Sequence, residues 1–330
     1  MSLNKRLATT GASSGGPSEA FNVLTYSGNS SSQSLNYGFK PGIFWPKSRS
    51  TSGRNYLTYN LDGTGKYLFP SSTQIEEGTG SSISFTNSGI DLTASFGWNH
   101  SGITYVGPAW GLPASGSSNT SGSVTTTTYA YPDAGQSMFT YTGDGASTST
   151  IGHGLSSAPE FVVIKTRSHV SDWPVYHSGL SGNNYRLRFN SDAAQDTTNN
   201  PWNSSAPTSS IINLGGSGNV NISSRTFWGM AFHSVSGYSK FGTYTGAGSA
   251  QTINIGFQPD HVWIKSRGAT DNWAMFDSAR GAKLLYINDH GAEEDFSFAF
   301  TSNGFEVPST SGMTNGSGLT YVYCAWKISV

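Results

Sequence analysis

The chain is poor in charge, cysteine and long apolar runs, and each shortage removes a class of protein. Only 11% of the 330 residues are charged and the formal net charge is -1, so no basic surface for nucleic acid or an anionic membrane is predicted. Cys324 is the single cysteine, which excludes an intramolecular disulfide and a cysteine metal cluster and predicts an inert core thiol. No stretch approaches the roughly 20 apolar residues that cross a bilayer, and the first residues lack the apolar run of a secretory signal. We therefore expect no nucleic-acid binding, no membrane insertion and no cofactor.

The residues that are abundant favour strands joined by many turns. Phe, Trp and Tyr make up 13% of the chain although hydrophobic residues reach only 35%, so large rings must fill the core. Glycine occurs 41 times, and together with Ser, Thr and Asn it supplies turns between short strands. No segment combines a helix cap with a sustained 3.6-residue period, which predicts an all-β fold.

A tripeptide and a spaced motif recur three times at matching offsets. Each Tyr-[Ser/Thr]-Gly is followed by Pro-x5-Lys-[Ser/Thr]-Arg and later by a closing aromatic block. The tripeptides are Tyr26-Ser27-Gly28, Tyr141-Thr142-Gly143 and Tyr244-Thr245-Gly246, and the triplets are Lys47-Ser48-Arg49, Lys165-Thr166-Arg167 and Lys265-Ser266-Arg267. The closing blocks end at Trp110, Phe232 and Trp326. This self-similarity predicts three related modules of about ninety residues each.

The repeats divide the chain into five parts. We expect β-sandwich modules at 21–112, 137–236 and 237–330, with a flexible Gly/Ser/Thr-rich linker at 113–136. The short connection between the second and third modules predicts rigid docking of that pair, whereas the first module is expected to move independently. Residues 1–20 hold too little apolar surface to fold alone, so we predict an extended N-terminal arm that anchors the protein through Asn4, Lys5 and Arg6.

Short apolar runs with a period of two fill the third module, and turn signals separate them. Asn87-Ser88-Gly89 and Ser302-Asn303-Gly304 are hairpin signals in the first and third modules. About eight strands per ninety residues predict three tandem antiparallel β-sandwich modules, of jelly-roll or lectin-like type.

One set of motifs in the third module resembles a known group of proteins. The motifs are Gly256 to Arg267, Trp273 to Gly281, Phe300 to Phe305 and Asn315 to Lys327. Together they resemble the lectin-like modules, similar in architecture to concanavalin A and SPRY domains, of structural proteins in tailed phages, many from marine and cyanobacterial phages. The second module is similar, but His177 to Ser181 replaces the Asp-Ser-Ala-Arg-Gly stretch, and Asn55 stands at the Trp273 position of the first module. The resemblance implies a virion component, for which homotrimers are common.

Tryptophans beside polar groups suggest where a sugar could bind. Trp173 and Trp273 each lie eight residues beyond a triplet lysine, and Asp271 lies just before Trp273. Trp202 lies in a predicted loop. Such rings can stack on a sugar while a neighbouring carboxylate binds hydroxyls; the alternative is that they are core residues.

Charged groups give further candidates, each with a structural alternative. Asp277 and Arg280 could contact a ligand or pair with each other as a clip across a turn. The lysine and arginine of each triplet could form an anion site, or lie on an exposed sheet face or a charge-protected edge. The acidic cluster from Asp289 to Asp295 could hold calcium or be a solvated loop.

No motif marks a catalytic centre. The seven histidines lack metal-ligand spacing, and no nucleophile elbow or phosphate loop occurs. Two carboxylates suffice for glycoside hydrolysis and need only meet in space, but nothing marks such a pair. We therefore predict a non-enzymatic protein on the external surface of a phage particle. The leading hypothesis is a tail fibre or tail-associated adhesin that contacts host glycans and binds other virion proteins through its arm. The alternative is a capsid-decoration or head-fibre protein with a structural role, and a glycan depolymerase is a distant third.

Overall fold

The computed structural model describes residues 19–93, 96–308 and 311–328, which form an all-β protein. Strands of the described residues pair antiparallel in six sheets, three large and three small. Each third of the chain contributes one large and one small sheet. We call these thirds segment one (19–112), segment two (113–236) and segment three (237–328). Asn4, Lys5 and Arg6 lie outside the described residues.

Segment one contains the first large sheet and a small sheet. The large sheet is ordered β1-β10-β3-β5-β6-β7, with β4 also paired to β10, and the small sheet is ordered β2-β9-β8. The strands are β1 (Phe21–Ser27), β2 (Gln33–Asn36), β3 (Pro41–Phe44), β4 (Lys47–Ser48), β5 (Leu57–Leu61), β6 (Thr64–Leu68), β7 (Glu77–Gly78), β8 (Ile83–Phe85), β9 (Gly89–Leu92) and β10 (Thr104–Gly111). Asp62 and Gly63 join β5 to β6 with φ values of 49° and 91°, as a two-residue hairpin turn requires.

Segment two has a seven-stranded large sheet, ordered β11-β12-β13-β19-β15-β16-β17, and a two-stranded sheet of β14 and β18. The elements are β11 (Ser117–Asn119), β12 (Thr126–Tyr131), the 3-10 helix η2 (Pro132–Ala134), β13 (Gln136–Thr142), β14 (Thr148–Gly152), β15 (Phe161–Thr166), β16 (Pro174–His177), β17 (Leu187–Arg188), β18 (Ile211–Gly215) and β19 (Thr226–Phe232). The predicted flexible linker at 113–136 is therefore wrong, because β12 pairs along its whole length with β13.

Segment three repeats the order seen in segment one, with sheets β20-β28-β22-β23-β24-β25 and β21-β27-β26. The elements are β20 (Ser239–Thr245), β21 (Gln251–Asn254), β22 (His261–Ser266), β23 (Ala274–Asp277), β24 (Gly281–Tyr286), β25 (Glu294–Asp295), β26 (Ala299–Thr301), β27 (Gly304–Val307), α1 (Gly312–Asn315) and β28 (Thr320–Trp326). Both predicted hairpin turns are confirmed, between β8 and β9 and between β26 and β27. Within the described residues, every helix is too short and too polar to cross a membrane.

The central strands of the large sheets are buried on both faces. On β22, Val262 and Ile264 pack toward the small sheet of their own segment, whereas Trp263 points the opposite way into a second core. Strands β15 and β28 alternate in the same manner between two clusters. Two-sided burial explains why these strands are nearly continuous apolar runs.

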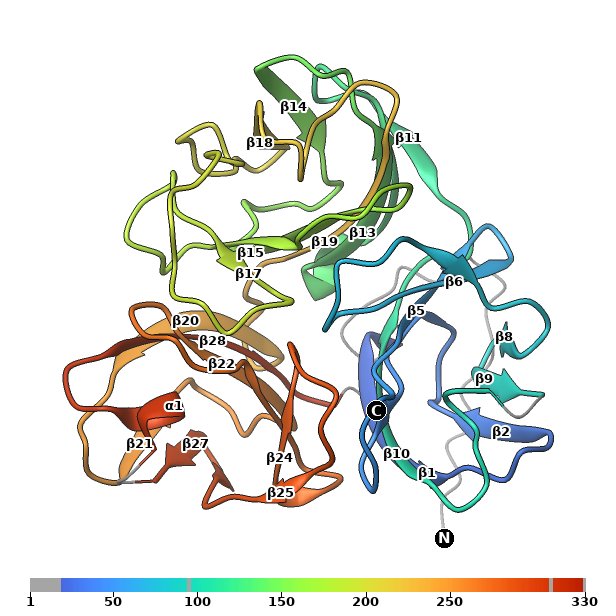
Figure 1. Ribbon diagram of the computed structural model, residues 1–330, viewed down its shortest axis with the longest axis vertical. Coiled ribbons are helices and arrows are strands. Elements are labelled where there is room, and N and C mark those ends of the chain that lie inside the picture. Colours follow the sequence, from blue (N-terminus) through green and yellow to red (C-terminus); the bar gives the residue numbers. More distant parts are fainter. Residues whose placement is uncertain (1–18, 94–95, 309–310, 329–330) are drawn as a thin grey trace, which may run out of the picture.

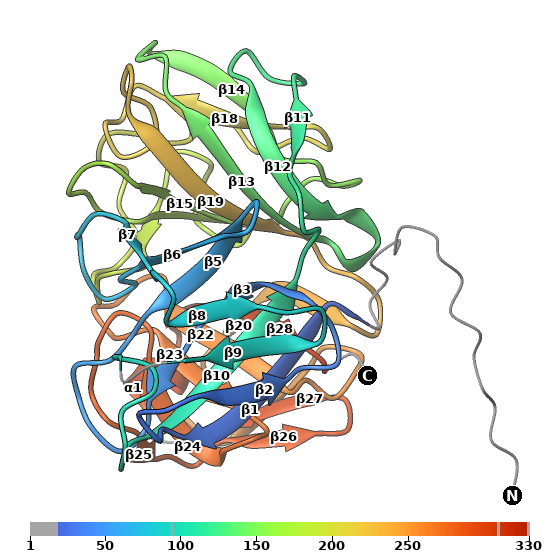
Figure 2. The ribbon, with the colours of Figure 1, turned by 90° about the vertical axis from the view of Figure 1, so that its right-hand side faces the viewer.

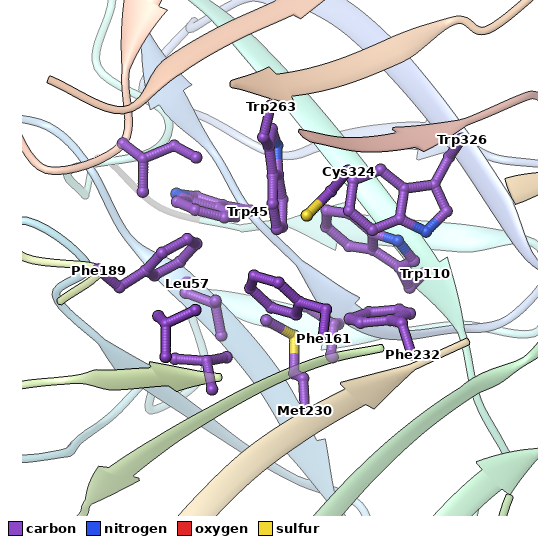
Figure 3. Packing of buried hydrophobic residues seen from close by; sticks show 14 of the residues in the cluster. Trp45, Leu57, Trp110, Phe161, Phe189, Met230, Phe232, Trp263, Cys324 and Trp326 are labelled. Atoms are coloured by element: carbon purple, nitrogen blue, oxygen red, sulfur yellow. The ribbon is translucent and has the colours of Figure 1, made fainter. Parts of the chain in front are cut away.

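The second core is shared by all three segments. In Figure 1 the large sheets face a common centre and the small sheets lie outward. Figure 3 shows rings from each segment meeting there: Trp110 and Trp263 lie 5.6 Å and 4.6 Å from Trp326, and Phe232 of segment two lies 5.4 Å from the same ring. Cys324 is buried among them, so its prediction as a core thiol is confirmed. The expected independent movement of the first module is wrong, because its separation would expose this aromatic cluster to water.

Candidate functional site

The three triplet lysines are buried, not displayed on a sheet face. Lys47, Lys165 and Lys265 are fully buried and lie at strand ends. Each ammonium group donates to backbone carbonyls: Lys47 to Asp289 at 2.6 Å, Lys165 to Thr166 at 3.0 Å and Lys265 to Ser266 at 2.8 Å. Burial lowers the pKa of Lys47 to about 7 and the pKa of Lys165 and Lys265 to about 8. The expected exposed face or edge is therefore wrong, and these lysines cannot form an anion site.

The triplet arginines each cross to a different segment. Arg49 of segment one pairs with Glu293 of segment three, with Nε and Nη2 each 2.9 Å from a carboxylate oxygen. Arg167 of segment two forms the same two-pronged contact with Glu76 of segment one. Arg267 of segment three donates to the carbonyl of Gly179 in segment two at 2.5 Å. The direction of contact is cyclic, so the three segments form a closed ring.

Backbone hydrogen bonds repeat the same cycle. The carbonyl of each triplet arginine accepts a hydrogen bond from a backbone N–H of the adjacent segment. The backbone N–H six residues after each triplet lysine donates to a carbonyl of the same adjacent segment. The first set is Glu293 to Arg49, Glu76 to Arg167 and Gln195 to Arg267; the second is Gly53 to His290, Ser171 to Thr73 and Asp271 to Asp192. These contacts span 2.8 to 3.0 Å. The loop after each triplet is therefore the docking element of its segment.

Two of the three predicted tryptophan platforms are part of this docking. Trp173 and Trp273 are fully buried, and their indole N–H groups donate across segments to Ser72 at 2.8 Å and Arg188 at 2.9 Å. Asn55, at the matching position, donates to the carbonyl of Ile287 at 2.9 Å. Trp202 is 1% exposed and packs against Tyr176. None of the three rings can stack on a sugar, because stacking needs an open ring face.

The charged candidates also have structural partners. Arg280 Nε lies 2.6 Å from Asp277 Oδ2, and both side chains have no exposed surface. This confirms the clip and removes both residues from ligand contact. Asp271 is half-buried, and burial raises the pKa of its carboxyl group. Its backbone N–H donates to the carbonyl of Asp192 in segment two. The acidic cluster is not a solvated loop throughout, because Glu293 is 17% exposed in its pair with Arg49.

Each interface carries a different polar group at one matching position. Twelve residues after the triplet lysine lie Tyr59, His177 and Asp277. The Tyr59 hydroxyl donates to Glu76, and His177 lies 3.1 Å from the carbonyl of Tyr323. Asp277 holds Arg280, whose Nη1 lies 3.7 Å from Glu293. These differences distinguish the three interfaces chemically, although their backbone contacts are alike.

Several cavities open on the surface of the described residues, and two of them adjoin each other. Cavities of about 740 Å³ and 530 Å³ share Lys40 and Ala114, the larger lying on segment one and the smaller where segments one and two meet. Cavities of about 360 Å³ and 280 Å³ lie beside Asn55 and Lys240. Among the described residues, no group of three His, Cys, Asp or Glu side chains could hold a metal ion.

Sequence reasoning missed the ring, although the sequence carries a signal for it. A sandwich with one wet face alternates apolar and polar residues, but Phe161 to Ile164 and Val262 to Ile264 are apolar at every position. Such runs indicate that a second apolar layer covers the outer face.

The fold and these contacts define an all-β protein in which three sheet pairs close around one aromatic core. The chain belongs to the family described as a domain of unknown function (DUF7483), which matches residues 16–329. That one family spans all three segments agrees with their shared core. No curated protein and no solved structure matches the chain.

Proposed function

We propose that this protein is a non-enzymatic structural component on the outside of a tailed-phage particle. The phage assignment rests on the sequence resemblance of segment three, and the same resemblance suggests three tandem lectin-like or jelly-roll β-sandwiches preceded by an anchoring arm. The observation that carries the structural role is the closed ring. The triplets and the loops that follow them, the most regular features of the sequence, serve contacts between segments.

The ring favours a capsid-decoration or fibre-spacer role over an adhesin that binds sugars through tryptophan. Trp173, Trp202 and Trp273 were the principal support for glycan contact, and all three are buried. A rigid body with a shared core suits a protein that must remain folded on a particle surface. An adhesin role would need a different binding surface.

A glycan depolymerase receives less support. Glycoside hydrolysis uses two carboxyl groups facing one groove, about 5 to 10 Å apart. The cavities described above are each lined by at most one carboxylate, Glu19 in one and Asp62 in another.

The ring also bears on assembly. Fibre proteins commonly reach threefold geometry as homotrimers, but here three homologous segments of one chain already meet around a centre (Figure 1). We propose that the folded body acts as a monomer and that residues 1–18, including Asn4, Lys5 and Arg6, attach it to other virion proteins.

Deletion of residues 1–18 tests this proposal. The truncated protein should keep the thermal midpoint of the full chain, because the described core begins at Ala20, yet it should be absent from purified particles. Quantitative mass spectrometry of particles complemented with each form measures incorporation. Full-length protein missing from particles would overturn the virion assignment, and normal incorporation of the truncated form would overturn the role of the arm.

A further inference from the structure

The cavity of about 740 Å³, which we call the segment-one groove, is lined mostly by segment one, and the matching strand positions of segment three carry larger aromatic side chains. Its lining residues include Lys40, Asp62, Lys66, Ser81, Ser84 and Phe85. Several of them belong to strands β6 and β8, whose places in the fold Figure 2 shows. The described strand registers explain why it is open.

In segment three the corresponding space is filled by phenylalanines. Phe298 stacks on Phe276 with ring centroids 4.0 Å apart, and Phe296 lies 5.4 Å from Phe276. Strand pairing gives the equivalences: Phe85 lies opposite Ile90 as Phe300 lies opposite Phe305. Counting along the chain from there places Ile83 and Ser81 where segment three has Phe298 and Phe296. A second pair of strands places Thr58, opposite Phe44, at the position of Phe276, opposite Val262. Ser81 and Ile83, which line the groove, are smaller than the phenylalanines at the matching positions of segment three.

The groove also holds a lysine that has lost its partner. In segment three Lys283 lies opposite Asp295 on the neighbouring strand, and the two form an ion pair. In segment one the matching lysine is Lys66, and the residue opposite is Gly78. Within the described part of the chain neither Lys66 nor Lys40 forms an ion pair. Two lysines therefore line the groove without an ion-pair partner, although Asp62 lines it as well.

We propose that the segment-one groove binds an acidic oligosaccharide of the uronic-acid type. Lys66 and Lys40 supply charge-assisted hydrogen bonds to sugar carboxylates, and Phe85, half-buried, offers a ring to an apolar sugar face. Ser81 and Ser84 are exposed hydroxyls for the remaining polar contacts. Asp62 disfavours densely sulfated chains, because each added anion near it is repelled. This site would restore a glycan-binding role to the proposed virion protein, although its binding does not depend on the particle.

The test uses the full chain and a short oligogalacturonate, titrated by calorimetry up to about 10 mM because single weak sites bind near the millimolar range. The neutral methyl-esterified oligomer and inorganic sulfate are the comparison ligands. Binding of the uronate, with at least tenfold weaker binding of both comparison ligands, supports the proposal. No uronate binding, or equal binding of the neutral oligomer or of sulfate, overturns it.

Three variants locate the site. Lys66→Ala should weaken uronate binding on the order of tenfold, the value of one charge-assisted hydrogen bond. Ser81→Phe restores the segment-three residue and should abolish binding without lowering the thermal midpoint. Lys283→Ala, the matched control in segment three, should bind like the unmodified chain. Uronate binding that survives both Lys66→Ala and Ser81→Phe would place the ligand elsewhere and overturn the assignment. Because the assay uses free protein, its failure leaves particle incorporation untouched, and the reverse also holds.

Discussion

At the scale of single residues, matching positions keep a structural task while their chemistry changes. The side chain eight residues after each triplet lysine donates to a carbonyl across an interface, from an amide in Asn55 and from an indole in Trp173 and Trp273. What matters there is an N–H at the correct distance, since an unpaired buried carbonyl costs about 1 to 3 kcal/mol. Trp273, which lies close to Asp271 in the sequence, is therefore a buried hydrogen-bond donor between segments and not a sugar platform.

His177 makes the interface between segments two and three sensitive to acid. The N–H of Gly179 donates to His177 Nδ1 at 2.9 Å, which leaves Nε2 to donate to the carbonyl of Tyr323. Protonation would place the ring's second N–H hydrogen on Nδ1, where it would face the Gly179 N–H donor. Burial accordingly lowers the pKa of His177 from 6.5 to about 4. Its contribution to stability is complete above pH 6.5 and is lost as the pH falls toward 4.

We expect His177→Gln to remove part of the acid sensitivity. Between pH 7 and pH 4.5 the free energy of unfolding of the unmodified chain should fall by about 2 to 3 kcal/mol more than that of the variant. Urea unfolding at the two pH values measures this difference. His169→Gln, at an exposed position, is the control and should retain the full loss. Parallel pH profiles for all three proteins would contradict the assignment.

At the scale of elements, the loop after each triplet strand joins one segment to the next. Glu76 and Arg167 are 12% and 20% exposed in a two-pronged pair between segments one and two. Lys283 and Asp295 form a pair within segment three in which Asp295 is 90% exposed. Loss of a partner from a mostly buried pair leaves a poorly hydrated charge, whereas solvent screens an exposed pair.

Glu76→Gln should lower the free energy of unfolding by about 2 kcal/mol, and Asp295→Asn by less than about 0.5 kcal/mol. Urea unfolding at neutral pH is the measurement. Near-equal losses in the two variants would show that the Arg167 contact contributes no more than a surface pair.

Much of this architecture could be predicted from the sequence at the level of elements. The repeats located β1, β13 and β20 and the closing strands β10, β19 and β28, and Asn-Ser-Gly and Ser-Asn-Gly located two hairpins. The segment 113–136 was misassigned because Gly and Ser dominate its first half, although Thr126 to Tyr131 carries the β-branched and aromatic residues of a strand. The segment-one groove depends on comparing strand registers between segments, which requires the pairing itself.

At the scale of the whole molecule, the ring closes where the chain begins and ends. Phe21 of segment one stacks on Trp326 of segment three with ring centroids 6.1 Å apart. The backbone N–H of Gly111 and the side-chain amide of Gln136 both donate to the carbonyl of Ala20. The contact of segment three with segment one therefore resembles the two contacts that the chain connects covalently. The stability of the protein should therefore depend on closure of the ring and not on which pairs of segments are joined covalently.

A circular permutant tests this directly. A short Gly/Ser linker joins residue 328 to residue 20, and new ends are placed between Ala114 and Ser115, which are both exposed. We expect one cooperative calorimetric transition with a midpoint within a few degrees of the parent, because the permutant keeps every strand pair and the shared core. A matched permutant opened between Val163 and Ile164, inside β15, should fail to fold, since that cut divides a strand buried on both faces. Separate transitions for the first permutant would mean that the segments unfold independently and that the shared core does not couple them.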